Sequence, residues 1–228
     1  MTKNDELKEL LKSLFFNRLP AVPGTQGESG FYGSLVAFAA LLILTIQPAM
    51  AQSTWTIDAS HSSAYFQVKH LMITNVRGDF NKISGKVLFD GKNFATVKAE
   101  AVIEVASINT REPKRDEHLR SADFFDAATY PRITFKSKRV ESVKGNRFNL
   151  VGDLTMRGVT KEITLNVEAA PIVKGMQGET RIGATATTSL NRQDYGVSWN
   201  RTLDAGGVVV GNEVRITLDL ELVQETAK

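Results

Sequence analysis

The stretch Ala64-Tyr-Phe-Gln-Val-Lys-His70 alternates between two kinds of side chain, mainly apolar at even positions and mainly polar at odd positions. Successive side chains of a β-strand point to opposite faces, so this period of two predicts a half-buried strand. Similar apolar segments follow along the chain: Ile83–Phe89, Val97–Val105, Ile133–Ser137, Phe148–Met156, Ile163–Val167, Ile182–Leu190 and Val214–Leu222. The chain after Ser53 is therefore expected to form about eight strands.

Residues that favour turns separate these segments, which predicts antiparallel hairpins and an all-β fold. The turns are Asp90–Asn93, Lys144–Asn146, Arg157-Gly158, Lys174–Gly178 and Gly206-Gly207. One connection, Arg111–Tyr130, is longer; we expect a short helix around Asp116–Ala122 within it, and the connection could fold over a barrel end. Hairpin-linked strands with one apolar face form either a sandwich or a closed barrel, and alternation does not choose between them.

The inward parities favour the barrel, because they carry many large apolar side chains. These are Phe66, Phe80, Phe89, Ile103, Phe135, Phe148, Leu154, Ile216 and Leu218. An eight-stranded barrel can enclose one ligand. Strands of roughly ten residues at about 3.3 Å each would give a lumen about 30 Å long, which suits a lipid chain better than a sugar or a nucleotide.

The first 51 residues differ from the rest. An apolar run of about twelve residues, Leu35–Ile46, is too short to span a membrane, which takes about 20 residues. Ala49-Met50-Ala51 follows it and has the small residues that a signal peptidase reads. We predict an N-terminal extension plus signal peptide over 1–51, cleavage after Ala51, and a folded domain over 52–228. The mature protein is then periplasmic and has no stable membrane span.

Composition excludes several classes of function. The chain has no cysteine, which excludes disulfides and thiolate chemistry, and its formal charge of +3 gives little support to a nucleic-acid partner. The three histidines, His61, His70 and His118, do not have the parity of a shared metal site. No Gly-x-Ser-x-Gly elbow accompanies Ser62 or Ser63. We predict no catalytic residue, no metal and no cofactor.

Taken together, several motifs resemble the YceI-like family of periplasmic polyisoprenoid-binding proteins. The motifs are Trp55–Ser63, Phe66-x-Val-x-His70, Val76–Phe80, Ser107–Thr110, Arg115–Asp126, Tyr130–Phe135, Gly152–Thr160, Leu190–Gly196 and Val210–Ile216. The resemblance covers nearly all of Trp55–Val223, in order. Two positions depart from the pattern: Asn212 stands where an acidic residue is usual, and Tyr195 where phenylalanine is common.

The resemblance implies an extended lipocalin-like antiparallel barrel that holds a long-chain isoprenoid or related amphiphilic lipid, with a possible homodimer. The residues expected at the ligand are Phe66, Val68, His70, Phe80, Phe89, Ile103, Phe124, Phe125, Phe135, Phe148, Leu154, Tyr195 and Ile216. Among them, Phe124 and Phe125 could gate the mouth, and His70 or Tyr195 could bind a polar head group. Two alternatives stay open: an exported structural or stress-protective barrel without a dedicated ligand, and an enzyme acting on an isoprenoid lipid.

Overall fold

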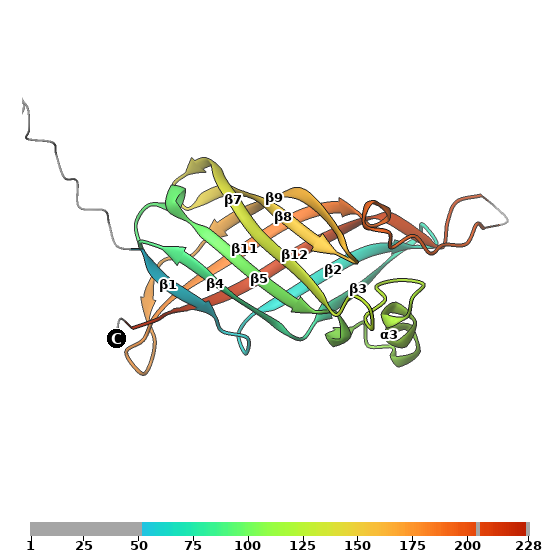
Figure 1. The fold of residues 1–228 in the computed structure, drawn as a ribbon, viewed down its shortest axis with the longest axis horizontal. Coiled ribbons are helices and arrows are strands. Elements are labelled where there is room, and N and C mark those ends of the chain that lie inside the picture. Colours follow the sequence, from blue (N-terminus) through green and yellow to red (C-terminus); the bar gives the residue numbers. More distant parts are fainter. Residues whose placement is uncertain (1–51, 204–205, 227–228) are drawn as a thin grey trace, which may run out of the picture. The chain divides into compact units, whose positions relative to one another are not determined.

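The computed structural model describes residues 52–203 and 206–226 (Figure 1). The expected extension, signal peptide and cleavage position lie outside these residues. The described part is an antiparallel β-structure in which one continuous sheet curls around an apolar interior. In the part of the chain described, no helix is long and apolar enough to cross a membrane.

The described residues contain twelve strands. They are β1 (Ser53–Ile57), β2 (Ser63–His70), β3 (Thr74–Phe80), β4 (Ile83–Phe89), β5 (Lys98–Glu104), β6 (Ile108–Asn109), β7 (Arg132–Lys144), β8 (Arg147–Met156), β9 (Val159–Ala169), β10 (Val173–Lys174), β11 (Thr180–Asn191) and β12 (Val210–Gln224). Each of the eight predicted segments overlaps one of them.

Eight of these strands close the barrel. Their order is β11-β9-β8-β7-β5-β4-β1-β12, and β12 pairs back onto β11 from Arg181↔Val223 to Asn191↔Glu213. All the pairings are antiparallel, as the hairpin turns predict. Because the sheet closes on itself, the all-β, lipocalin-like barrel expected from the sequence is confirmed.

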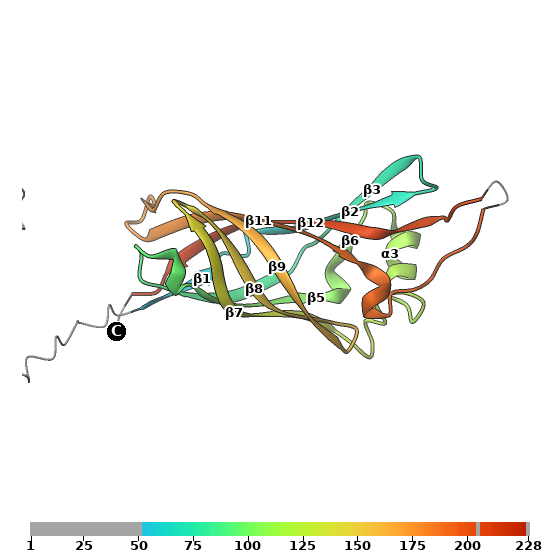
Figure 2. The ribbon, with the colours of Figure 1, turned by 90° about the horizontal axis from the view of Figure 1, so that it is seen from above.

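The remaining strands extend the barrel. β1 and β2 both lie along β12, separated by a bend at 58–62, while β3 and β4 continue each other beside them. Figure 2 shows the β2–β3 hairpin reaching beyond the barrel at the end that carries the helix α3. β1 and β4 therefore belong to the barrel, while β2 and β3, which continue them, form an extension.

The long connection contains one α-helix, α3 (Pro113–Arg120), which begins three residues before the predicted helix. Pro113 stands in its first turn, and the Glu112 side chain caps it by accepting from the Lys114 backbone amide at 3.3 Å. Arg115 fixes the helix to the chain after β6 by donating to the Thr110 hydroxyl at 2.7 Å and to the Thr110 carbonyl at 2.8 Å. The connection thus packs at one end of the barrel.

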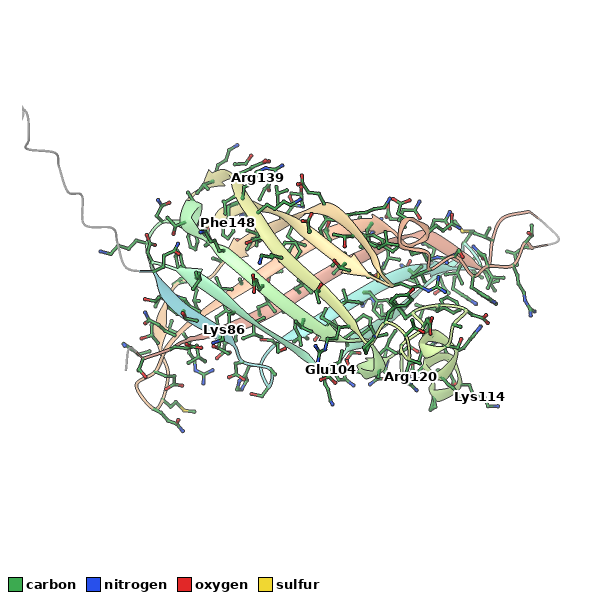
Figure 3. The ribbon with its side chains drawn as sticks, in the orientation of Figure 1. Lys86, Glu104, Lys114, Arg120, Arg139 and Phe148 are labelled. Carbon is green, nitrogen blue, oxygen red and sulfur yellow. The ribbon has the colours of Figure 1, made fainter. Side chains whose placement is uncertain are left out.

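Three short 3-10 helices complete the described elements: η1 (Phe94–Thr96), η2 (Val105–Ser107) and η3 (Arg192–Tyr195). Side chains sort by face as a barrel requires. The charged residues Arg139 and Lys114 lie exposed at the outside of the molecule (Figure 3), whereas Phe148 is buried. The apolar faces of all the barrel strands therefore meet in one interior.

Candidate functional site

The barrel interior holds an elongated cavity. The space open to the centre of a water molecule amounts to about 240 Å³, whereas a single water needs only about 10–15 Å³ on the same measure. Its wall is almost entirely apolar, and the lining residues run from Trp55 and Phe94 at one end to Phe124 and Val210 at the other. An apolar cavity of this kind favours a long apolar ligand over a sugar or a nucleotide.

Eleven of the thirteen residues expected at the ligand line this cavity: Phe66, Val68, Phe80, Phe89, Ile103, Phe124, Phe125, Phe135, Phe148, Leu154 and Ile216. His70 and Tyr195 are not among the lining residues. Strand parity therefore identified the inner face. Contact between these side chains and a ligand stays a prediction.

Phe124 and Phe125 lie where the connection after α3 meets the cavity. Phe125 meets Phe80 edge to face, with ring centroids 5.8 Å apart, and Phe124 meets His118 in the same way at 5.0 Å. Trp199 contacts both Phe124 and His118, at 5.2 and 5.1 Å. Phe124 therefore joins the connection to the segment after η3, and Phe125 joins it to β3. We call Phe124, Phe125, His118 and Trp199 the cover of this end.

Arg157 at the β8–β9 turn holds the same cover. Its guanidinium donates to the Ala122 carbonyl at 2.8 Å and to the Gly196 carbonyl. The His118 ring hydrogen-bonds the Asp123 carboxylate within the connection at 2.8 Å. The cover is therefore held by polar contacts at its rim and by aromatic contacts at its centre.

The opposite end of the cavity is aromatic as well. Phe94 stacks between Phe89 and Phe148, with centroid distances of 5.0 and 5.2 Å. Trp55 is 1% exposed and donates its indole N–H to the Phe89 carbonyl at 3.1 Å, which satisfies its polar atom. Three of the four rings at this end lie on strands and Phe94 lies on η1, whereas Phe124, Phe125 and Trp199 at the α3 end lie on connecting segments.

The two polar residues expected to reach a head group lie elsewhere. His70 has the inward parity, but it ends β2 in the hairpin that extends past the barrel, and it pairs with Thr74 and Val210. Tyr195 is 1% exposed and ends η3, where burial raises the pKa of its phenol. The structure therefore places neither residue at the cavity wall.

Arg192 is the buried charged residue at the described cavity wall, and it was not predicted to line it. It is 4% exposed and donates to the carbonyls of Gly211, Val197, Trp199 and Val210 at 2.6 to 3.2 Å. Asp194, although only two residues away in the sequence, pairs instead with Lys161 at 3.7 Å. Burial lowers the pKa of Arg192. Its role in the structure is to hold residues 197–199 and 210–211 together beside η3.

Several other lining residues were also missed. Among them are Trp55, Leu150, Leu165, Val167, Ile182 and Leu222. Most lie on strands that alternation did predict, so the signal was present. The prediction favoured phenylalanines and left out the aliphatic residues, although every inward position of a barrel strand faces the lumen.

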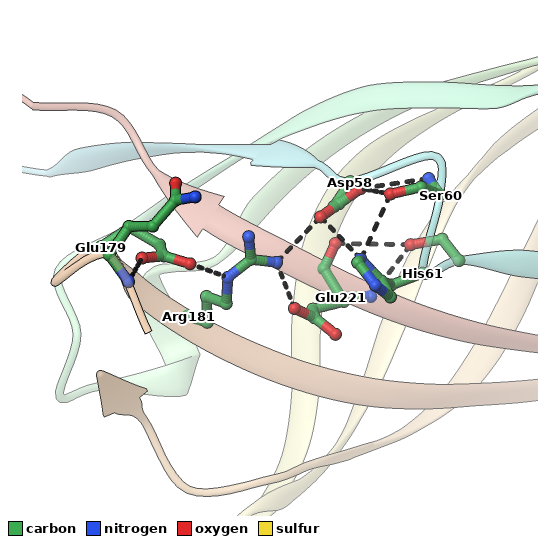
Figure 4. A network of polar contacts seen from close by, with 8 residues as sticks. Asp58, Ser60, His61, Glu179, Arg181 and Glu221 are labelled. Carbon is green, nitrogen blue, oxygen red and sulfur yellow. Dashed lines mark hydrogen bonds and ion pairs between the residues drawn. The ribbon is translucent and has the colours of Figure 1, made fainter. Parts of the chain in front are cut away.

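A polar network lies outside the lumen at the β1–β2 bend (Figure 4). The ligand atoms of Asp58, His61 and Glu221 lie within 4.8 Å of one another, a spacing that could suit a metal ion. The guanidinium of Arg181 already binds both carboxylates, with Nη1 2.8 Å from Oδ2 of Asp58. A cation therefore already occupies the position between the two acids. His70 and His118 do not belong to this group.

Comparisons with known proteins agree with this architecture. The family model of the YceI-like domain matches residues 55–222. The UPF0312 protein SA2479 of Staphylococcus aureus (strain N315) is 40% identical over 170 residues, which cover 74% of this chain and 96% of that protein. The match thus covers nearly the whole length of that relative.

Solved structures give the same picture. BcnA of Burkholderia cenocepacia is 27% identical with a TM-score of 0.64, covering 72% of this chain and 98% of BcnA. A polyisoprenoid binding domain from Saccharophagus degradans, implicated in plant cell wall breakdown, has a TM-score of 0.56 at 19% identity, covering 75% and 98%. The second likeness shows the fold alone. From the family model, the relative and the shared barrel, the chain belongs to the YceI-like family.

Proposed function

We propose that this protein is an exported binding protein that holds a long-chain isoprenoid or related amphiphilic lipid in its barrel lumen, without chemical turnover. The observation that carries the proposal is the elongated cavity with an almost wholly apolar wall. A neighbour in fold is described as a polyisoprenoid binding domain, which supports the same class of ligand.

Affinity would come from burying the apolar chain, at about 0.8 kcal/mol per buried CH₂, less the cost of ordering the ligand. Such a wall discriminates weakly between apolar chains of similar width, so we expect affinity to depend more on chain length than on branching. A barrel without a dedicated ligand would instead be filled by its own side chains, and the cavity argues against that alternative.

An enzyme would need titratable groups that converge on a bound lipid. Among the described lining residues the charged ones are Glu100 and Arg192. Glu100 pairs with Lys136 on the outer surface at 2.8 Å, and Arg192 is surrounded by backbone carbonyls. This arrangement supports binding over catalysis.

The first experiment needs no guess about the ligand. The full chain is expressed in a Gram-negative host, the periplasmic fraction is purified without detergent, and the protein is analysed by native mass spectrometry and solvent extraction. A stoichiometric prenyl-type lipid is the expected result. A ligand-free protein that also fails to take up added prenyl alcohols would contradict the proposal. The mass of the purified chain also tests export, because cleavage after Ala51 leaves Gln52 as the first residue.

A pair of variants on one strand tests whether the lipid lies in the lumen. Ala184 lines the cavity, while Thr187 on the same strand is exposed on the outer face. Ala184→Trp should fill the lumen and abolish lipid uptake, whereas Thr187→Trp should leave uptake unchanged. Circular dichroism of both variants checks that the barrel has formed. Equal uptake by the two variants would place the lipid outside the lumen. Light scattering of the same samples tests the expected homodimer.

A further inference from the structure

The turn that joins β2 to β3 has an unusual sequence for its backbone. It is closed by a hydrogen bond from the Ile73 amide to the His70 carbonyl at 3.1 Å. Its central residues, Leu71 and Met72, have φ angles of 50° and 60°. Two successive positive φ angles are typical of type I′ hairpin turns, which favour Asn-Gly because larger side chains are strained there. The turn therefore carries large apolar residues where its conformation disfavours them.

These apolar side chains point into solvent. Ile73 is 79% exposed and Met72 is 52% exposed, and the hairpin that carries them reaches beyond the barrel (Figure 2). We call Leu71–Ile73 the apolar tip. Large side chains in a strained, exposed turn contribute little to the folded core, so a role at the surface accounts for them better than packing does.

A second segment supports the tip. The Leu71 amide donates to the Val209 carbonyl at 2.8 Å, and Met72 lies close beside Gly207. Trp199 and Arg201 precede Gly207 in the chain, and the Arg201 guanidinium lies 5.9 Å from the centre of the Trp199 ring. The Val209 amide in turn donates to the Arg201 carbonyl at 3.0 Å, so this segment brings a cation to the side of the tip.

The charge around the tip has one sign. In the described residues 68–77, 197–203 and 206–212 the cations are Lys69, Arg77 and Arg201, and no acidic side chain occurs. If Asp204 is counted from the sequence, three cations less one anion leave a charge of +2. An exposed apolar tip within a basic rim matches a bilayer that contains anionic phospholipid.

The tip also lies next to one end of the lumen. His70, which precedes the tip, pairs with Val210, and Val210 lines the cavity. From this placement together with the charge, we propose that the β2–β3 hairpin is a membrane-docking element. The apolar tip inserts into the interface of an anionic bilayer, and Lys69, Arg77 and Arg201 contact the lipid phosphates. This inference goes beyond lipid storage in the lumen, and it holds for empty protein as well.

The test is flotation of the purified protein with vesicles of phosphatidylcholine, either alone or with about one third phosphatidylglycerol. We expect binding to the anionic vesicles that weakens at high salt. Met72→Ser/Ile73→Ser should lower the partition coefficient about tenfold or more. Lys69→Gln/Arg77→Gln should lower it about fivefold for each charge removed. The matched controls lie away from the tip: Val173→Ser/Met176→Ser, also exposed, and Lys92→Gln/Lys144→Gln. Both controls should bind like the unmodified protein.

A direct reading of insertion is possible because the chain contains no cysteine. Ile73→Cys and Met176→Cys are each labelled with an environment-sensitive fluorophore. A blue shift on vesicle addition is expected at position 73 and not at position 176. Equal binding of the tip variants and their controls, or no shift at position 73, would overturn the proposal. So would tip-dependent self-association in light scattering without vesicle binding, which would assign the tip to a second copy of the chain. Loss of lipid from the lumen changes none of these readings, so the two proposals can fail separately.

Discussion

Arg181 on β11 donates a hydrogen bond from Nη1 to Oδ2 of Asp58, 123 residues earlier in the chain, at 2.8 Å. The contact joins the start of β11 to the β1–β2 bend (Figure 4). Hydrogen bonds from Ser60, His61 and Arg181 hold the pKa of Asp58 well below its usual range. The bend therefore carries a fixed negative charge at neutral pH.

This charge makes the contribution of His61 depend on pH. The hydrogen bond to Asp58 raises the pKa of His61, so its stabilisation is fully present below the unfolded pKa of about 6.5 and is lost as the pH rises through the higher folded pKa. We expect the unmodified protein to have a higher thermal midpoint than His61→Gln at about pH 5.5, with the difference closing above about pH 8. The effect should be small because the side chain is 60% exposed. Asp58→Asn should remove it, and a pH-independent difference would contradict this account.

Arg192 should be the most costly charged residue to replace. Arg192→Met removes the guanidinium donor from four backbone carbonyls, of which Val210 keeps the Asn200 side-chain amide as a donor at 2.8 Å. We expect a loss of at least about 3 kcal/mol in the free energy of unfolding by urea. Arg215→Met is the control, because that side chain is 70% exposed and pairs only with Glu213. It should change stability by about 0.5 kcal/mol or less. Similar losses in the two variants would show that Arg192 contributes only as a surface cation does.

Two strand glycines should respond differently to alanine. A Cβ on Gly152 would lie 2.5 Å from the Lys136 carbonyl and 2.8 Å from the Ser137 Cα, so the β7–β8 pairing must shift. A Cβ on Gly183 would meet its nearest atom, the Cβ of Ala170, at 3.4 Å. Gly152→Ala should cost about 2 kcal/mol or more, whereas Gly183→Ala should be neutral or stabilise by up to about 1 kcal/mol. Urea unfolding of both variants measures the two changes in stability. If Gly152→Ala left the stability unchanged, β7 and β8 would be able to separate at this position.

The cover at the α3 end should control how fast a ligand leaves. Phe124→Ala/Phe125→Ala removes two rings from the connecting segment, and we expect a bound fluorescent prenyl probe to dissociate about tenfold faster. Phe94→Ala is the comparison, because it removes a lining ring at the opposite end. It should weaken binding without a comparable gain in release rate. Faster release from Phe94→Ala alone would place the exit at that end instead.

The sequence predicted the strands well because alternation reports local burial, which each strand carries in its own residues. It could not choose between a sandwich and a barrel, because closure depends on which distant strands pair, here β12 with β11 and β1. The family resemblance supplied that step. Pro113 indicates the helix start, because proline is favoured in the first turn of a helix. The prediction did not use this signal and placed the start three residues later, at Asp116.

The errors in the site have physical reasons too. Parity says which face His70 is on, but not that β2 runs past the end of the lumen. Tyr195 was placed by its motif, whereas in the structure it ends a 3-10 helix and is buried outside the residues that line the cavity. Arg192 was missed because Asp194, two residues later, suggests an ion pair at a surface turn. The backbone carbonyls that Arg192 binds instead come together only in the folded chain.

The strand that closes the barrel is also the last to be synthesised. β12 is 15 residues long and pairs with β1, β2 and β11, and its contact between Gln224 and Trp55 spans almost the whole domain. Pairings this distant in sequence are slow to form, because the loop entropy is lost before the contacts compensate it. We therefore expect β1 and β11 to lack their β12 partner in the growing chain until β12 has been made. Truncations near the C-terminus should therefore abolish the barrel as a whole rather than shorten it.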